Sequence, residues 1–160
     1  MKQSSLANWL KIIIVGLGIC GLIIFCIVLP ILGQTIDQAY QGEFHSHYLF
    51  WLIFIWVAAV PCYAVLVLAW RVAVNIGKDR SFSIQNAKLI KGISYLAAAD
   101  SAFFFLGNII SLFFNLNHPS VVLASLFIIF IGVAISVAAA VLSHLILKAQ
   151  VLQEQSDWTI

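Results

Sequence analysis

Four long apolar stretches limit most strongly how this chain can fold. They cover residues 12–32, 48–70, 92–114 and 121–147. A helix rises about 1.5 Å per residue, so roughly 20 apolar residues cross the hydrocarbon core of a bilayer, which is about 30 Å thick. The first two stretches contain no charged residue, the third contains only Asp100, and the fourth is interrupted only by His144. We therefore predict an all-α integral membrane bundle of four transmembrane helices with up-down connectivity.

The composition favours the same class of protein. Of the 160 residues, 63% are hydrophobic and 9% are charged, whereas soluble domains have about 45–50% apolar and about 25% charged residues. A soluble domain of this size could not bury so much apolar surface. We expect a single membrane domain over residues 1–160, with the first stretch retained because it exceeds the apolar core of a secretory signal. No block of like charge indicates direct binding of nucleic acid.

The basic residues predict the orientation of the four helices. They precede the first apolar stretch, lie between the second and third, and follow the fourth: Lys2, Lys11, Arg71, Lys78, Arg80, Lys88, Lys91 and Lys148. The connections 33–47 and 115–120 contain no lysine or arginine. Connections rich in lysine and arginine stay in the cytoplasm. We thus predict a cell-membrane protein with both termini, the loop 71–91 and the tail 148–160 in the cytoplasm.

Asp100 is the sharpest candidate for a functional residue within the membrane. An ionisable side chain in lipid is costly, so it usually faces the interior of the bundle and has a role. It lies about nine residues from Lys91, which is roughly 13 Å along a helix. At that depth the fourth helix offers Ser136 or Ala140 rather than His144. The carboxyl group is interpreted as a neutral hydrogen-bonding contact between helices, as a proton or ligand site, or as a device for packing specificity.

Small and polar residues mark the helix faces that we expect to pack. Close approach of helices in lipid requires small side chains. On the predicted third helix, Asp100, Gly107 and Ser111 fall near one line along the helix surface, with Asn108 beside it. The fourth helix has a small or polar residue at every fourth position: Gly132, Ser136, Ala140 and His144. The first helix has Gly16, Gly18 and Gly21. These stripes are interpreted as packing faces. A ligand pathway along Asp100, Asn108, Ser111 and Ser136 is the alternative.

Other patterns carry weaker indications of chemistry. In an extended chain, Glu43, His45 and His47 would share one face and could bind zinc or copper together with His118; the alternative is a polar outer loop without metal. The cysteines Cys20, Cys26 and Cys62 all lie in apolar stretches and form no C-x-x-C pair. No hydrolase, nucleotide or metalloprotease motif is present. We therefore expect no enzymatic activity and no cofactor.

The basic loop has the signature of a helix start. Ser81 or Ser83 can act as the N-cap, and Asn86 follows Ser83 by three residues. The basic residues of the loop would also suit anionic lipid headgroups. A docking surface for a soluble partner is the alternative interpretation of this loop.

Two stretches resemble a known bacterial membrane family. The first is Ser-Phe-Ser-Ile-Gln-Asn-Ala-Lys at 81–88, continuing to Ile93, and the second runs from Leu142 through Leu-Gln-Glu at 152–154 to Asp-Trp-Thr-Ile at 157–160. They are similar to the family catalogued as domain of unknown function 2975. Gln155 and Trp158 depart from the family pattern, which weakens any role for the exact charge of the tail. The candidate docking residues are Phe82, Ser83, Asn86, Lys88, Gln153, Glu154 and Asp157.

The resemblance implies a context rather than an activity. Members of the family have no established activity and are typically encoded beside a very small Cro-like helix-turn-helix regulator. The leading hypothesis is therefore a non-enzymatic membrane protein that regulates or anchors such a cytosolic DNA-binding partner. Two alternatives stay open: a small proton- or cation-coupled transporter or channel component that uses Asp100, and an immunity-type protein against membrane-active peptides. Self-association into a homo-oligomer is compatible with each of them.

Overall fold

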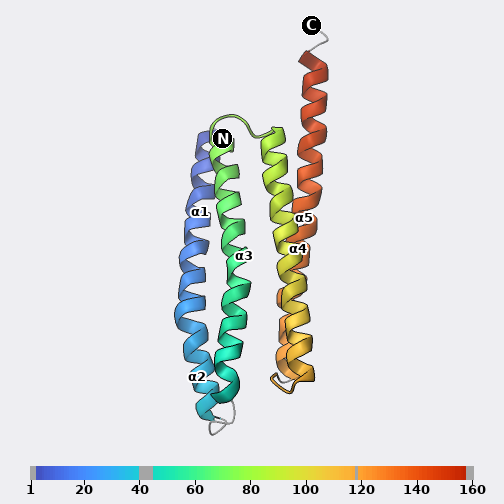
Figure 1. Cartoon of the computed structure of the whole chain (residues 1–160). Helices are drawn as coiled ribbons and strands as arrows, with labels where there is room; N and C mark the ends of the chain where they lie inside the picture. Colours follow the sequence, from blue (N-terminus) through green and yellow to red (C-terminus); the bar gives the residue numbers. More distant parts are fainter. Residues whose placement is uncertain (1–2, 40–44, 118, 158–160) are drawn as a thin grey trace.

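The computed structural model describes residues 3–39, 45–117 and 119–157, and these residues form four helical rods (Figure 1). The first rod consists of α1 (Gln3–Ile23), a π-helical segment η1 (Ile24–Val28) and α2 (Leu29–Ala39), followed by α3 (His45–Gly77), α4 (Ile84–Phe113) and α5 (Pro119–Asp157). All four rods are long and apolar enough to cross a membrane. The described residues contain no strand. The predicted all-α fold with four spans is confirmed.

The four rods form an open row rather than a closed bundle. Close backbone contacts join α1 to α3, α3 to α4 and α4 to α5, and within the described residues no such contact joins the first rod to α4 or α5, or α3 to α5. Consecutive rods run in opposite directions (Figure 1). Both ends of the described chain and the connection between α3 and α4 therefore lie at one end of the row. We call it the basic end, because Lys11, Arg71, Lys91 and Lys148 lie there, and the other the opposite end.

The helices extend beyond the apolar stretches at the basic end. Helix α3 runs to Gly77 and α4 begins at Ile84, so the predicted loop 71–91 is reduced to residues 78–83. Helix α5 continues to Asp157, so most of the predicted tail is helical. Hydropathy marks only where lipid begins, whereas capping groups decide where a helix stops.

The short loop at the basic end is defined by caps on both sides. Ser83 has extended backbone angles, and its hydroxyl accepts a hydrogen bond from the Asn86 amide at 3.2 Å, so it is the N-cap of α4. Asp79 has a φ of 58°, and the Arg80 amide donates to the Asn75 carbonyl at 3.0 Å. This left-handed ending satisfies the last carbonyls of α3. Of the two predicted caps, the structure selects Ser83.

The turn at the opposite end also ends its helix with a residue in the left-handed conformation. Asn115 has a φ of 55°, and the Leu116 amide donates to the Ser111 carbonyl at 2.8 Å. Asparagine tolerates this left-handed conformation better than most residues. The described residues of this connection therefore form a tight turn between α4 and α5.

The π-helical segment of the first rod is explained by Pro30. Proline has no amide hydrogen to donate to a carbonyl one turn earlier, and the Leu29 amide donates to the Ile24 carbonyl instead. A side chain of α3 supplies a donor to the Phe25 carbonyl, which the shifted Leu29 amide leaves: the Trp56 indole nitrogen donates to it at 3.1 Å. The Tyr48 hydroxyl of α3 also donates to the Pro30 carbonyl, at 3.3 Å. The helix irregularity is thus part of the interface between the first rod and α3.

Helices α4 and α5 pack through small and polar side chains. The residues of α4 on this seam recur at alternating spacings of three and four: Ala87, Ile90, Ser94, Ala97, Ser101, Phe104, Asn108 and Ser111. The facing residues of α5 include Ser125, Gly132, Ser136, Ala139, Ser143 and Ile146. This spacing is typical of a coiled-coil seam.

The predicted packing stripe on the fourth helix is wrong in its second half. Gly132 and Ser136 do face α4, but Ala140 and His144 are exposed, and Ala139 and Ser143 take their places. Steps of four residues rotate by about 40° around a helix each time, so a strict every-fourth line leaves the seam after two steps. On the first rod, Gly18 and Gly21 lie against α3, whereas Gly16 faces open space.

Candidate functional site

The four candidate ligand or proton residues do not form one site. Asp100 faces α3, Ser136 faces α4 near the basic end, and Asn108 and Ser111 reach a cavity at the opposite end. Asp100 and Asn108 are eight residues apart, so they project about 80° apart around α4. The described structure therefore offers three separate polar clusters in the membrane and no continuous pathway of these four side chains.

Asp100 pairs with a cysteine of α3. The Cys62 Sγ donates to the Asp100 Oδ2 at 3.4 Å, while Oδ1 is buried and has no hydrogen-bond partner in the described structure. The expected alignment of Asp100 with Ser136 on the fourth helix is wrong, because the neighbouring Ser101 occupies that face instead. The depth of each residue along its helix, counted from the basic end, could have identified Cys62 as the partner of Asp100. Cys62 lies nine residues before Arg71, just as Asp100 lies nine residues after Lys91.

Ser136 is part of a hydrogen-bonded contact between α4 and α5. Its hydroxyl donates to the Ser94 carbonyl at 2.9 Å and lies 3.3 Å from the Ser94 hydroxyl. Seven residues further along each helix, which is about two turns, the Ser143 hydroxyl donates to the Ala87 carbonyl at 2.7 Å. Serines that bond across helices satisfy their own hydroxyl groups and hold two backbones close together. This geometry gives Ser136 a packing role.

Asn86 holds the loop at the basic end together. Its side chain is 1% exposed, and its Oδ1 accepts from the Asn75 Nδ2 at 2.8 Å. Its Nδ2 donates to the carbonyls of Arg80 and Ser81, at 3.1 Å each. Asn86 is therefore not a surface residue that a partner can contact directly, which corrects that part of the predicted docking set. It acts by positioning the residues around it.

The remaining predicted docking residues divide between the loop and α5. Phe82 is 59% exposed and Lys88 is exposed, whereas Ser83 is occupied as the N-cap of α4. Gln153 is exposed on α5. Glu154 and Asp157 belong to α5, but their side chains lie outside the described part of the structure.

Helix α5 projects past the rest of the row. Ser143 is opposite Ala87, and α5 continues fourteen residues beyond Ser143, whereas α4 begins only three residues before Ala87. At about 1.5 Å per residue, α5 extends roughly 16 Å past the first residue of α4, as Figure 1 shows. Val151 and Leu152 on this projecting segment are 54% and 59% exposed.

Most of the predicted metal ligands lie outside the residues that the structure describes. Glu43 and His118 are not among the described residues, nor is the side chain of His45, while His47 lies in the first turn of α3. Within residues 3–39, 45–117 and 119–157, no three side chains of metal-binding type gather. The metal site at the opposite end therefore stays a prediction.

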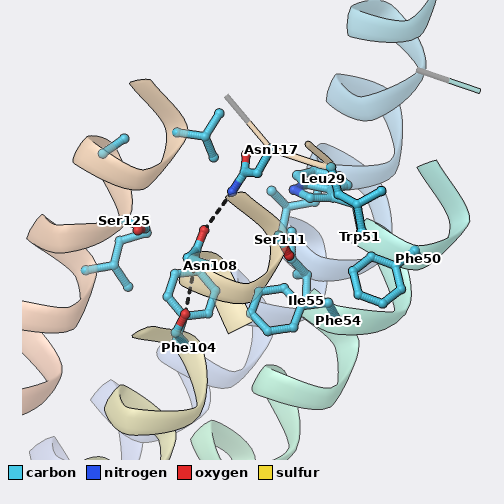
Figure 2. Close-up of a pocket in the computed structure, with 14 residues that line it drawn as sticks. Leu29, Phe50, Trp51, Phe54, Ile55, Phe104, Asn108, Ser111, Asn117 and Ser125 are labelled. Carbon is cyan, nitrogen blue, oxygen red and sulfur yellow. Dashed lines mark hydrogen bonds between the residues drawn. The ribbon is translucent and has the colours of Figure 1, made fainter. Parts of the chain in front are cut away.

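A cavity of about 170 Å³ lies at the opposite end. It is lined by Leu29, Phe50, Trp51, Phe54, Ile55, Phe104, Asn108, Ser111, Leu116, Asn117, Val121, Ala124, Ser125 and Ile128. The Asn117 Nδ2 donates to the Asn108 Oδ1 at 2.9 Å, and the Asn108 Nδ2 donates to the Phe104 carbonyl at 2.8 Å (Figure 2). Sequence reasoning identified Asn108 and Ser111 but missed Asn117, whose position in a turn gave no indication that it folds back over Asn108.

Comparison with known proteins gives a family but no activity. No solved structure matches this chain significantly. The chain is 28% identical over 163 residues to the "Uncharacterized membrane protein YoaS" of Bacillus subtilis (strain 168), and the match covers 99% of each protein. A family model described as "Protein of unknown function (DUF2975)" matches residues 31–160. This match covers α3, α4 and α5 in full, and so the chain belongs to the DUF2975 family of proteins of unknown function.

Proposed function

We propose that this protein is a non-enzymatic membrane anchor or regulator that docks a soluble partner at its basic end, with that end in the cytoplasm of the cell. The observation that carries the proposal is the projection of α5 by roughly 16 Å past the first residue of α4. A helix that only spans lipid has no need of this extension. The partner is the small helix-turn-helix regulator that the family resemblance implies.

The projecting segment and the loop form the docking surface. Val151 and Leu152 lie beyond Lys148 and are more than half exposed, as is Phe82 on the loop. Apolar side chains exposed outside lipid mark interaction sites when they cluster. The buried Asn86 amide keeps the loop in one conformation, so Phe82 is presented without a large ordering penalty on binding.

Co-purification tests this proposal. A small helix-turn-helix regulator of the proposed kind, produced together with the protein, is expected to remain with it in mild detergent extracts. A chain ending at Ala149 should lose it, because the apolar residues of the projection are absent. Phe82→Ala should reduce the amount recovered severalfold. Phe113→Ala is the matched control, since Phe113 is also exposed but lies at the opposite end. Equal recovery with all four proteins, or none with the parent, would contradict the proposal.

A second candidate function is favoured by one specific observation at Asp100. Its Oδ1 has no partner in the described structure, and its Oδ2 is bonded only by a thiol. A carboxyl group in this environment can take up and release a proton, as in many membrane transporters. The candidate is a small proton- or cation-coupled transporter or channel component.

A flux measurement separates this candidate from a purely structural carboxyl group. If Asp100 carries protons or cations, Asp100→Asn should abolish flux in liposomes while the protein still folds, because the amide preserves size but cannot ionise. Asp79→Asn is the control, because this loop carboxyl lies outside the lipid. Parent liposomes that show no flux would eliminate the candidate, as would an Asp100→Asn protein with unchanged flux.

A further inference from the structure

The cavity at the opposite end has the size and the lining residues of a binding site for a small apolar molecule. Most of its lining is apolar or aromatic, with Trp51 and Phe54 from α3 facing Ala124 and Ile128 from α5. Its volume of about 170 Å³ is close to that of an engineered protein cavity of about 150 Å³ that binds benzene. A lipid acyl chain is much longer than this space, so the volume favours a molecule of about one ring.

One edge of the cavity is polar and incompletely bonded. Ser111 is only 7% exposed and lines the cavity, and its side-chain hydroxyl has no hydrogen-bond partner within the described residues. Figure 2 shows Ser111 between the aromatic residues of α3 and the pair formed by Asn108 and Asn117. Serine hydroxyls elsewhere on the α4–α5 seam do have partners, for example Ser101 with the Ala97 carbonyl. The Ser111 hydroxyl is therefore available to form a hydrogen bond with a molecule in the cavity.

The lining also specifies the charge of the ligand. None of the fourteen lining residues carries a charge. Bringing a charged molecule into such surroundings would leave that charge unpaired in a medium of low dielectric constant. A molecule with no polar group at all would leave Ser111 unbonded. The surroundings therefore suit a neutral molecule with an apolar ring and one hydroxyl-type group.

We propose that this cavity binds a neutral, ring-sized amphiphile of the phenol type, whose hydroxyl group forms a hydrogen bond with Ser111 while its ring lies against Trp51 and Phe54. The cavity is at the other end of α4 from the docking surface. Binding here goes beyond the proposed anchoring role and does not depend on it.

Fluorescence quenching tests the site with a defined probe. Trp51 lines the cavity, so 4-bromophenol added to the purified protein in detergent should quench part of the tryptophan emission saturably through contact with its heavy atom. Unlabelled phenol should reverse this component by competition, and Trp51→Phe should abolish it. Quenching that rises linearly with probe, and that Trp51→Phe leaves unchanged, would show partition into the micelle and would overturn the proposal.

Matched substitutions test the hydrogen bond and the location. Ser111→Ala should weaken phenol competition about tenfold while leaving competition by benzene unchanged, because only phenol can bond to the hydroxyl. Ser101→Ala, on the same seam of α4, should leave both unchanged. Ala124→Phe should fill the cavity and remove saturable quenching, whereas Ala134→Phe, on an exposed position of α5, should retain it. Equal loss of phenol and benzene competition in Ser111→Ala, or retained binding in Ala124→Phe, would refute the site.

Discussion

Replacing Gly132 with leucine is expected to separate α4 from α5 and to lower the free energy of unfolding by at least about 2 kcal/mol. A Cβ atom at Gly132 would overlap the Ser101 hydroxyl, with the Ser101 Cβ and the Ala97 carbonyl close behind. Rotation of Ser101 can make room for a single methyl group. It cannot make room for a leucine side chain, because the remaining neighbours belong to or adjoin the α4 backbone.

The measurement is an unfolding titration with sodium dodecyl sulfate in mixed micelles, followed by circular dichroism. Ala134→Leu is the control, because Ala134 is exposed on the same helix and leucine there should be tolerated. Gly132→Ala should give an intermediate result. If Gly132→Leu and Ala134→Leu had the same midpoint, the close approach of these two helices would not contribute to stability.

Replacing Asn86 with leucine is expected to destabilise the basic end by about 3 kcal/mol, because three hydrogen bonds of its side chain are lost at roughly 1 kcal/mol each. Leucine has a similar size, so the main change is polar. The Asn75 amide and two loop carbonyls lose their partner. The loop should then open far more often than in the parent protein.

Limited trypsin digestion measures this opening directly, since Lys78 and Arg80 lie in the loop. Cleavage there should become at least tenfold faster in Asn86→Leu and should precede global unfolding. Gln85→Leu is the matched control, because the neighbouring Gln85 is exposed. Unchanged cleavage in Asn86→Leu would mean that the Ser83 cap alone defines the loop.

The parts of the fold that follow from local rules were predictable from sequence. Hydropathy identifies the four spans because the cost of leaving polar groups in lipid exceeds every competing local preference. The N-cap at Ser83 and the turn at Asn115 follow from side chains that bond to nearby backbone. The end of α3 at Gly77 was not predictable from apolar length, because the helix continues past its apolar stretch until the left-handed turn at Asp79 ends it.

The relations between helices were less predictable. A helix alone does not reveal which face meets which neighbour, so Asp100 was matched with the fourth helix although its partner Cys62 is on α3. The seam of α4 and α5 alternates between steps of three and four, and a strict step of four misplaced its second half. For the candidate site, Asn108 and Ser111 were identified as polar residues in lipid, but the cavity beside them is formed jointly by α2, α3, α4, α5 and the turn between α4 and α5.

The open row has a consequence for how the protein is made. Within the described residues each rod makes close backbone contacts only with the rods next to it in the chain. Such contacts have low sequence separation, which favours fast folding. The first rod can pair with α3 as soon as α3 has entered the membrane, and α4 and α5 can then be added one at a time. A chain that ends at residue 77 would already contain both sides of the interface between the first rod and α3.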